Sequence, residues 1–371
     1  MPLLAVLAVL AGISWWLTRP RPFLEAVSFG DLPGWRAADL APALSAFRRS
    51  CAVLGRAGEI SAYGGSTAQW RQVCAELPGA NVAGRAFFES NFIPYEFGRE
   101  AVFTGYYEPT IRGSRSRHGR FQTPVYGAPN DLVRVDLGAF SPKFTGEHIA
   151  GRLQADRLVP YPSRGEIDGR GLAAAPILLW CDDPIALFFL QIQGSGRVQF
   201  DDGRLERLQY AGENGRPYTA IGKTLVAAGR LARDRVSLQT IRAWLKAHPR
   251  LSRGVMEADQ SFVFFREAPI GDPGLGSPGV EKVALTPEGS LAIDLRYNVL
   301  GAPYYVAASP IHALLVAQDT GGAIRGAFRG DIFFGSGARA EAEAGRLDAR
   351  GRLFVLLPKS VAAGLGRGYT P

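Results

Sequence analysis

Two aspartates lie in a glycine-rich stretch near the C-terminus, AQDTGGAIRGAFRGDIFFG (residues 317–335). They are Asp319 and Asp331, and five glycines stand between Gly321 and Gly335. Three apolar residues follow Asp331 directly. An apolar surround raises the pKa of a carboxyl group because desolvation disfavours its charged form. A general acid needs a raised pKa near neutral pH, so we predict Asp331 as a catalytic acid.

Two further acids are candidates for supporting this one. Asp319 precedes TGGAIRG, a loop whose turns call for the positive φ angles that glycine adopts at little cost. It could serve that loop alone, by accepting hydrogen bonds from backbone N–H groups. Asp294 follows an apolar run in AIDLRYNVLG, where an aspartate is costly unless it is hydrogen-bonded or functional.

Three other stretches combine aromatic, amide and glycine residues: FTGYYEP (103–109), LQIQGSGRVQF (190–200) and YAGENGRPY (210–218). Aromatic rings stack on sugar faces, and amides pair with hydroxyl groups. An ordinary β-turn beside a packed ring is the alternative for each stretch. The predicted substrate-binding residues are Thr104, Tyr106, Tyr107, Gln193, Gly194, Ser195 and Asn214.

Other chemistries find little support in the sequence. GLGSPG (274–279) matches a dinucleotide fingerprint, but Pro278 and the lack of a following helix pattern indicate a surface loop. No G-x-S-x-G motif is present, and the four histidines are scattered. No Cys/His spacing fits a zinc site, so we expect neither a metal nor a cofactor.

Short patterns predict a mainly β protein with flanking helices. Helical periodicity covers residues 40–54, with Asp39 as a candidate cap, and 66–77, capped by Ser66. From residue 101, including 177–200, short apolar runs alternate with Gly, Pro and Asn, which is typical of strands in a barrel or sandwich. Helices return at 219–232 and 237–248, where Pro249 is expected to end them, and strands follow from 261.

Composition bounds the class of protein. The chain has 371 residues, of which 47% are hydrophobic and 20% charged, as in a folded protein of one large or two ordinary domains. Its formal charge of +8 suits an acidic partner such as nucleic acid, anionic lipid or an acidic polymer. No basic helix or Arg/aromatic strip appears, so nucleic acid is not expected.

The N-terminal residues 2–17 are apolar and uncharged. They fit a signal peptide or a marginal signal anchor, so we expect export. Among the three cysteines, Cys51 and Cys74 lie on adjacent helical patterns. They could form a disulfide in an oxidising compartment, or all three cysteines, with Cys181, could be small buried hydrophobes.

Taken in order, several long motifs resemble the membrane-bound lytic murein transglycosylase A family: FTGYYEP, VYGAP, QGSG, YAGENGRPYTAIGK, QSFVFF and AQDTGGAIRG…GDIFFG. The resemblance implies a double-psi β-barrel of the three-aspartate type at 256–371 and an inserted second β-barrel with trailing helices at 108–255. It also implies a helical N-terminal part of the first domain at 20–107 and a signal peptide or anchor at 1–19. The groove between the barrels would hold a glycan strand.

The resemblance also implies a reaction. Family members cleave the β-1,4 bond between N-acetylmuramic acid and N-acetylglucosamine without water and leave 1,6-anhydromuramic acid ends. One aspartate acts as acid and then as base; it falls on Asp331, and Asp319 and Asp294 match the other two. A glycosidase that uses water normally needs two carboxylates, whereas an internal attack needs one. Phe333 stands where the family more usually has tyrosine.

Two other functions remain open at this stage: a non-catalytic murein-binding scaffold on the same fold, or a glycoside hydrolase that uses water. The expected partners are peptidoglycan glycan strands, together with cell-wall synthesis proteins as candidates. The expected location is the periplasm or cell envelope, with the apolar N-terminal segment as a membrane attachment. Family members are often lipoproteins, but no cysteine precedes Cys51, so a lipid anchor is not expected.

Overall fold

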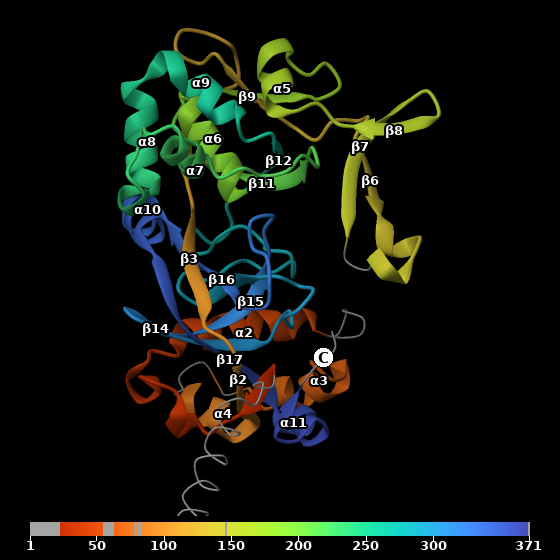
Figure 1. The fold of residues 1–371 in the computed structure, drawn as a ribbon, viewed down its shortest axis with the longest axis vertical. Coiled ribbons are helices and arrows are strands. Elements are labelled where there is room, and N and C mark those ends of the chain that lie inside the picture. Colours follow the sequence, from red (N-terminus) through yellow and green to blue (C-terminus); the bar gives the residue numbers. More distant parts are fainter. Residues whose placement is uncertain (1–22, 55–62, 78, 80–83, 145–146, 370–371) are drawn as a thin grey trace, which may run out of the picture.

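The protein is described by a computed structural model covering residues 23–54, 63–77, 79, 84–144 and 147–369 (Figure 1). The predicted export segment lies outside these residues. Within them, no helix is long and apolar enough to cross a membrane.

The larger sheet contains a closed ring of strands. Across the described residues its order is β14-β15-β13-β16-β3-β17-β2-β1-β18, and β14 also pairs with β17. The first six strands in that order therefore close into a barrel. The strands are β1 (Leu24–Ala26), β2 (Phe92–Phe97), β3 (Ala101–Glu108), β13 (Ser290–Ile293), β14 (Pro303–Ala308), β15 (Ile311–Asp319), β16 (Arg329–Ser336), β17 (Asp348–Pro358) and β18 (Gly368–Tyr369).

Three helices cover one end of this barrel (Figure 1): α2 (Ala41–Val53), α3 (Thr67–Ala75) and α4 (Gly84–Asn91). Their buried aromatic rings join the strands in one core. Ser66 begins α3 as predicted, in a capping box with Gln69, whereas Leu40 rather than Asp39 is the cap residue of α2. A disulfide joins Cys51 to Cys74 and confirms that interpretation. Cys181 is unpaired and buried.

The second sheet has the order β12-β11-β10-β4-β9-β5 among the described residues. Gly127, just beyond β5, forms a bridge with Phe265 of β12, so the two edges of this sheet approach each other. The strands are β4 (Thr110–Ser114), β5 (Thr123–Tyr126), β9 (Ile177–Cys181), β10 (Gly196–Phe200), β11 (Leu205–Glu213) and β12 (Val263–Ala268). The helices around it are α5 (Arg164–Arg170), α6 (Pro184–Gln193), α7 (Ile221–Ala227), α8 (Leu238–Ala247) and α9 (Pro249–Glu257).

The helices of this part correct one prediction, confirm a second and shorten a third. Residues 184–193, predicted as strand, form α6, because the Asp183 side chain accepts hydrogen bonds from two N–H groups of the first turn and Pro184 fits that turn. A fully buried apolar run has no periodicity that separates helix from strand. Pro249 does end α8, but it also begins α9. The helix predicted at 219–232 is confined to α7.

A third, three-stranded sheet forms an arm beside the other two (Figure 1), built from β6 (Val133–Asp136), β7 (His148–Gln154) and β8 (Arg157–Pro160). Glu147 pairs with Arg296 of the barrel at 3.3 Å, and Arg134 donates to the Ala211 carbonyl on β11. The arm is therefore attached to both larger parts. The remaining elements are η1 (Phe29–Asp31), η2 (Trp35–Ala37), η3 (Leu137–Ala139), η4 (Pro142–Phe144), η5 (Arg233–Arg235), α10 (Gly337–Arg346) and α11 (Lys359–Leu365).

One strand connects the barrel to the second sheet. β3 belongs to the barrel, and the chain passes through Pro109 directly into β4. Glu108, 2% exposed at the end of β3, pairs with Arg197 at 2.8 Å and with Arg207 at 3.1 Å. Ser277 also donates to this carboxylate, at 2.7 Å. A buried carboxylate shared by two arginines fixes how the two sheets meet.

Candidate active site

Four neighbouring barrel strands align the predicted acids in one row. Asp319 on β15 is opposite Ala292 on β13, which is opposite Asp331 on β16, which is opposite Thr104 on β3. Residues directly opposite each other lie on the same face of a sheet. The row therefore places Asp319, Asp331 and Thr104 on one face of the barrel wall.

Asp331 is a partly buried carboxyl group that has one hydrogen-bond donor in the part of the chain that the structure describes. Thr104 Oγ1 donates to its Oδ1 at 2.6 Å, and Arg329 Nη2 donates to that same Thr104 oxygen at 2.6 Å. Burial raises the pKa of Asp331, and the Thr104 hydrogen bond and the Arg329 charge oppose this rise only in part. A larger fraction of Asp331 is therefore protonated near neutral pH than of an ordinary aspartate, as a general acid requires.

Asp319 is engaged at both oxygens. Tyr106 donates to its Oδ2 at 3.0 Å, and the Val280 N–H donates to Oδ1 at 3.2 Å. Burial raises the pKa of Asp319 to about 6, against the hydrogen bonds from Thr320, Tyr106 and Val280. Burial and the nearby carboxylates hold the pKa of Tyr106 well above its usual value, so this hydroxyl stays a donor. Asp319 thus positions Tyr106 beside the acid.

Asp294 lies outside the row and fastens the loop before β16. Its carboxylate accepts from Arg296 Nη2 at 2.7 Å and from the Gly326 N–H at 2.7 Å. Burial alone would raise its pKa, but these hydrogen bonds prevail and the pKa is lowered. Gly326 has φ +93, a conformation that favours glycine. Asp294 therefore anchors this loop through its hydrogen bonds.

Two residues that were predicted to contact substrate are buried in the structure. Tyr107 is 2% exposed and packs under α10, where its hydroxyl accepts from Arg242 at 3.2 Å. Asn214 is 0% exposed; its Nδ2 donates to the Pro162 and Gln260 carbonyls at 2.9 Å each. Both side chains form hydrogen bonds in the interior, and substrate contact by them stays a prediction.

The predicted strand break at Gln193, Gly194 and Ser195 is the end of α6. Gly194 caps this helix in a left-handed conformation with φ +80. Gln193 Oε1 accepts from the Tyr107 N–H at 3.0 Å, which ties the helix end to β3. All three residues are half-buried. Substrate contact by these residues stays a prediction.

Two residues near Asp331 were not among the predicted site residues. Arg329 precedes it by two positions in β16, a spacing that puts both side chains on one face. Tyr218 follows β11, and its side chain is 40% exposed. Burial raises the pKa of Tyr218 to about 12, and the charges of Asp259 and Asp331 add to that effect. Its hydroxyl therefore lies within electrostatic reach of the acid.

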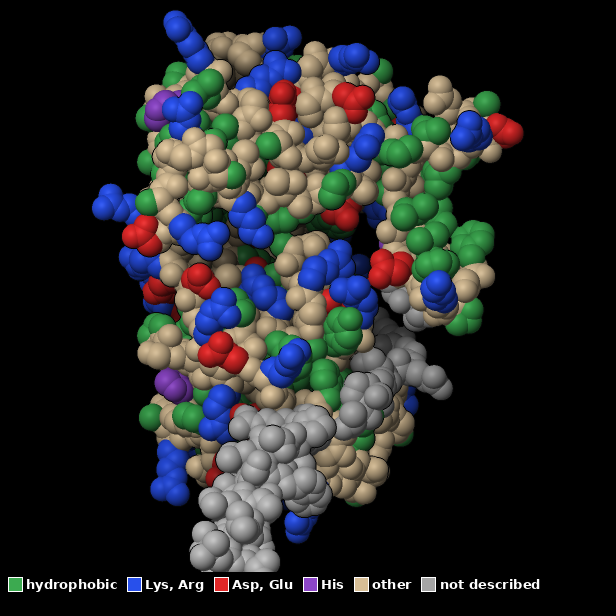
Figure 2. Space-filling view, in the orientation of Figure 1, with side chains coloured by type: hydrophobic (Ala, Val, Ile, Leu, Met, Phe, Trp, Pro, Cys, Tyr) green, Lys and Arg blue, Asp and Glu red, His purple; other side chains and the backbone are tan. Residues whose placement is uncertain are grey.

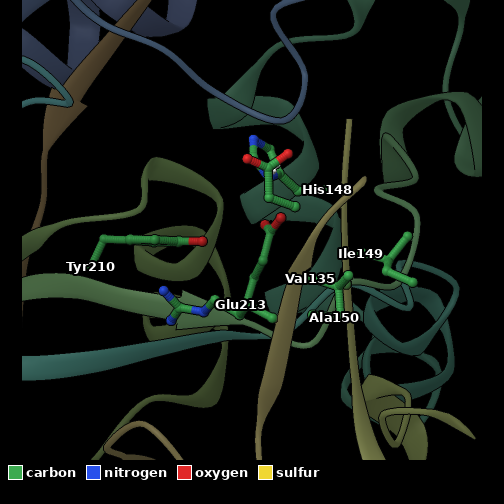
Figure 3. A pocket seen from close by; sticks show the side chains of 9 residues that line it. Val135, His148, Ile149, Ala150, Tyr210 and Glu213 are labelled. Atoms are coloured by element: carbon green, nitrogen blue, oxygen red, sulfur yellow. Dashed lines mark ion pairs between the residues drawn. The ribbon is translucent and has the colours of Figure 1, made fainter. Parts of the chain in front are cut away.

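Two pockets flank this region. One, of about 630 Å³, is lined by Thr104 and Asp348 of the barrel and by residues 234–237 and Thr240 of the second part. The other, of about 400 Å³, lies between the arm and β11, where Tyr210 and Glu213 face His148 (Figure 3). Burial raises the pKa of Glu213, against the attraction of two nearby arginines, one of them in the loop after Asp319.

Among the described residues, no cluster of His, Cys, Asp or Glu could hold a metal ion.

The fold, a closed barrel joined to a second sheet, is similar to that of solved murein transglycosylases. The membrane-bound lytic murein transglycosylase from Agrobacterium tumefaciens has a TM-score of 0.81 and 31% identity, covering 92% of this chain and 99% of that one. The Escherichia coli MltA structure with bound chitohexaose has a TM-score of 0.67 and 27% identity, covering 91% and 95%.

Sequence comparisons identify the family. The model of the MltA specific insert domain matches residues 102–266, and that of the 3D domain matches residues 289–357. Membrane-bound lytic murein transglycosylase A of Escherichia coli (strain K12) is 33% identical over 285 residues, covering 72% of this chain and 68% of that protein. This chain belongs to the membrane-bound lytic murein transglycosylase A family, and the predicted resemblance is confirmed.

Proposed function

We propose that this protein is a peptidoglycan lytic transglycosylase with Asp331 as its only acid and base. The observation that supports this most strongly is the setting of Asp331: a partly buried carboxyl with a raised pKa, one oxygen of which accepts a hydrogen bond from Thr104, a residue that lines the pocket of about 630 Å³. Family membership adds the substrate class, since the named relatives are murein transglycosylases.

The reaction proceeds in two proton transfers. Protonated Asp331 gives its proton to the oxygen between N-acetylmuramic acid and N-acetylglucosamine, and the bond from that oxygen to C1 of the muramic acid breaks. The Asp331 carboxylate then accepts the proton of the 6-hydroxyl group of the same muramic acid, whose oxygen bonds to C1. The product ends in 1,6-anhydromuramic acid, and no water is consumed. Effective molarity favours the internal attack once the ring is held in place.

The surface suits an anionic polymer. Lys and Arg side chains gather across the middle of the face in Figure 2, in keeping with the formal charge of +8. Peptidoglycan strands bear peptides with carboxylate groups, so a positive surface raises their local concentration.

The finer architecture follows the same proposal. The closed ring of six strands would be the double-psi barrel of the three-aspartate domain, with residues 256–371 and the N-terminal part at 20–107 forming one domain. Residues 108–255 would be the inserted domain. The glycan would lie between them, where Thr104 and Asp348 line the larger pocket.

The proposal extends to location. A disulfide between Cys51 and Cys74 suits an oxidising compartment, and the relatives are named membrane-bound. These observations support the periplasm or cell envelope, with residues 2–17 as export signal or membrane attachment and cell-wall synthesis proteins as partners.

Mass spectrometry of products tests the function. Wild-type protein and Asp331→Asn are each incubated with isolated peptidoglycan. The wild type should release muropeptides one water lighter than hydrolysis products, and the variant should be slower by roughly 10²–10⁴-fold. Binding without release by either protein would favour a scaffold. Hydrated ends would indicate a hydrolase, whose second carboxylate could be Asp348, opposite Thr104 on β17; an Asp348→Asn variant would then lose activity.

A further inference from the structure

Arg329, Thr104 and Asp331 form a chain of hydrogen bonds that ends on the acid. The guanidinium donates to Thr104 Oγ1 at 2.6 Å, and Thr104 Oγ1 donates to Asp331 Oδ1 at 2.6 Å. We propose that Arg329 is a positioning residue of the reaction: it directs the Thr104 hydroxyl toward Oδ1 and so keeps the proton of the acid on Oδ2. This inference rests on the proposed role of Asp331.

The direction of the chain follows from which groups can donate. A guanidinium has donors only, whereas a hydroxyl has one proton and can also accept. Hydrogen bonds in a chain polarise one another, so a hydroxyl that accepts from a cation becomes a better donor and a poorer acceptor. Thr104 therefore donates to Asp331 Oδ1 rather than accepting a proton from it. When Asp331 is protonated, its proton resides on Oδ2, which has no hydrogen-bond partner among the described residues.

The guanidinium is itself held in place by backbone. Arg329 Nη1 donates to the Gly330 carbonyl at 2.8 Å and to the Val102 carbonyl at 3.4 Å. Val102 is the partner of Arg329 on β3, as Thr104 is the partner of Asp331. The pairing of β16 with β3 thus fixes Arg329 and Asp331, the two ends of the hydrogen-bond chain. Rotation of the Arg329 side chain away from Thr104 would break these contacts.

Several groups influence the acid, and only one changes when Arg329 is substituted. The charged and titratable side chains around Asp331 on the surrounding elements are Arg329, Tyr106, Asp319, Tyr218 and, beyond Thr104 on β17, Asp348. The Arg329 charge lowers the pKa of Asp331. Loss of this charge should therefore move the pH dependence of kcat and kcat/KM to higher pH.

The test is the pH profile of kcat and kcat/KM on isolated peptidoglycan for Arg329→Gln. The alkaline limb should move to higher pH, because Asp331 keeps its proton longer without the neighbouring charge. Yet kcat at the optimum should fall about tenfold or more, because the proton is no longer confined to Oδ2. Arg329→Lys retains the charge and a hydrogen-bond donor, so the alkaline limb of its pH profile should stay near that of the wild type.

Arg350→Gln is the matched control. Arg350 is opposite Val102 on β17, as Arg329 is on β16, but it is exposed and pairs only loosely with Glu100, at 3.9 Å. This variant should show the wild-type limb and rate. A fall in kcat for Arg329→Gln with an unmoved limb would mean that Arg329 is merely structural, and the inference would fail.

A double-mutant cycle tests the route through the hydroxyl. In a Thr104→Val background, Arg329→Gln should cost far less in kcat than it does in the wild type. If the losses in kcat caused by the two substitutions are fully additive, the proposed hydrogen-bond chain is contradicted. If Arg329→Gln does not fold, Arg329→Met, which has neither the charge nor a donor, gives the same comparison in both backgrounds.

A measurement without turnover separates this inference from the proposed function. The ¹³C chemical shift of the Asp331 carboxyl carbon, followed against pH, should titrate at higher pH in Arg329→Gln than in the wild type or in Arg350→Gln. Equal titrations would overturn the inference even if the enzyme releases anhydro products. If the Asp331 titration shifts but the protein has no activity, the proposed influence of Arg329 on Asp331 is supported. The proposed function is then refuted.

Discussion

Tyr106 on β3 donates a hydrogen bond to Asp319 on β15 at 3.0 Å, although β13 and β16 lie between the two strands. A bond that spans this width of the barrel wall stabilises a partly buried carboxylate. Hydrogen bonds to charged groups contribute about 1.5–3 kcal/mol. Tyr106→Phe should therefore lower the free energy of unfolding by an amount in that range, as measured by urea denaturation at pH 7.5. Tyr297→Phe, which removes the hydroxyl group of an exposed tyrosine, is the control; an unchanged Tyr106→Phe protein would contradict the prediction.

Glu281 should make stability depend on pH. Burial raises its pKa to about 7, against hydrogen bonds from Ser50 and Gln318. A carboxyl with a raised folded-state pKa stabilises the fold when protonated, so this contribution is complete below its unfolded pKa and is lost as pH rises through 7. Wild-type protein should be more stable at pH 5 than at pH 8, and Glu281→Gln should reduce that difference. Asp319 acts in the same direction at lower pH, so part of the dependence should remain.

Glu108→Gln should destabilise the junction of the two sheets. The substitution leaves Arg197 and Arg207 buried without a counter-charge. Removing one partner of a buried ion pair costs about 3–5 kcal/mol. Chemical denaturation should show this loss, whereas Asp202→Asn, which removes an exposed partner of Arg204, should leave stability unchanged. Equal stability of both variants would mean that the buried cluster contributes nothing.

Tyr218→Phe should impair turnover without affecting stability. Its ring is partly exposed and its hydroxyl lies within electrostatic reach of Asp331 from the second part of the molecule. We expect this hydroxyl to donate one hydrogen bond to substrate, and loss of such a bond corresponds to about 1 kcal/mol, or roughly fivefold in kcat/KM. The same substitution at Tyr210, also exposed but in the pocket beside the arm, tests whether the effect is specific to the acid.

The sequence predicted the residues aligned across the barrel wall better than it predicted the residues around them. Asp331, Asp319 and Thr104 stand in motifs of unusual composition, and the strand register brings them together. Tyr107 and Asn214 stand in equally distinctive motifs, yet both are interior, because a motif does not reveal which side of a strand faces the core. Tyr107 points away from the row by strand alternation and packs under α10.

Other features depend on contacts between distant segments. Arg329 acts on Asp331 through Thr104, so its role requires knowing that β16 pairs with β3. The position of Tyr218 depends on how the second sheet is set against the barrel. Residues 184–193 were assigned to a strand because a short, uniformly apolar run fits either element, and only the Asp183 cap distinguishes them.

The passage of β3 into β4 has a mechanical consequence. Two strands joined by Pro109 alone, with Glu108 paired to two arginines, should permit little rotation of the barrel against the second sheet. We therefore expect the space between the barrel and the second sheet to keep a constant width rather than to close around a substrate. If the glycan lies between the barrel and the second sheet, as proposed, we expect the distortion that brings the 6-hydroxyl group under C1 to be imposed on the sugar rather than on the protein.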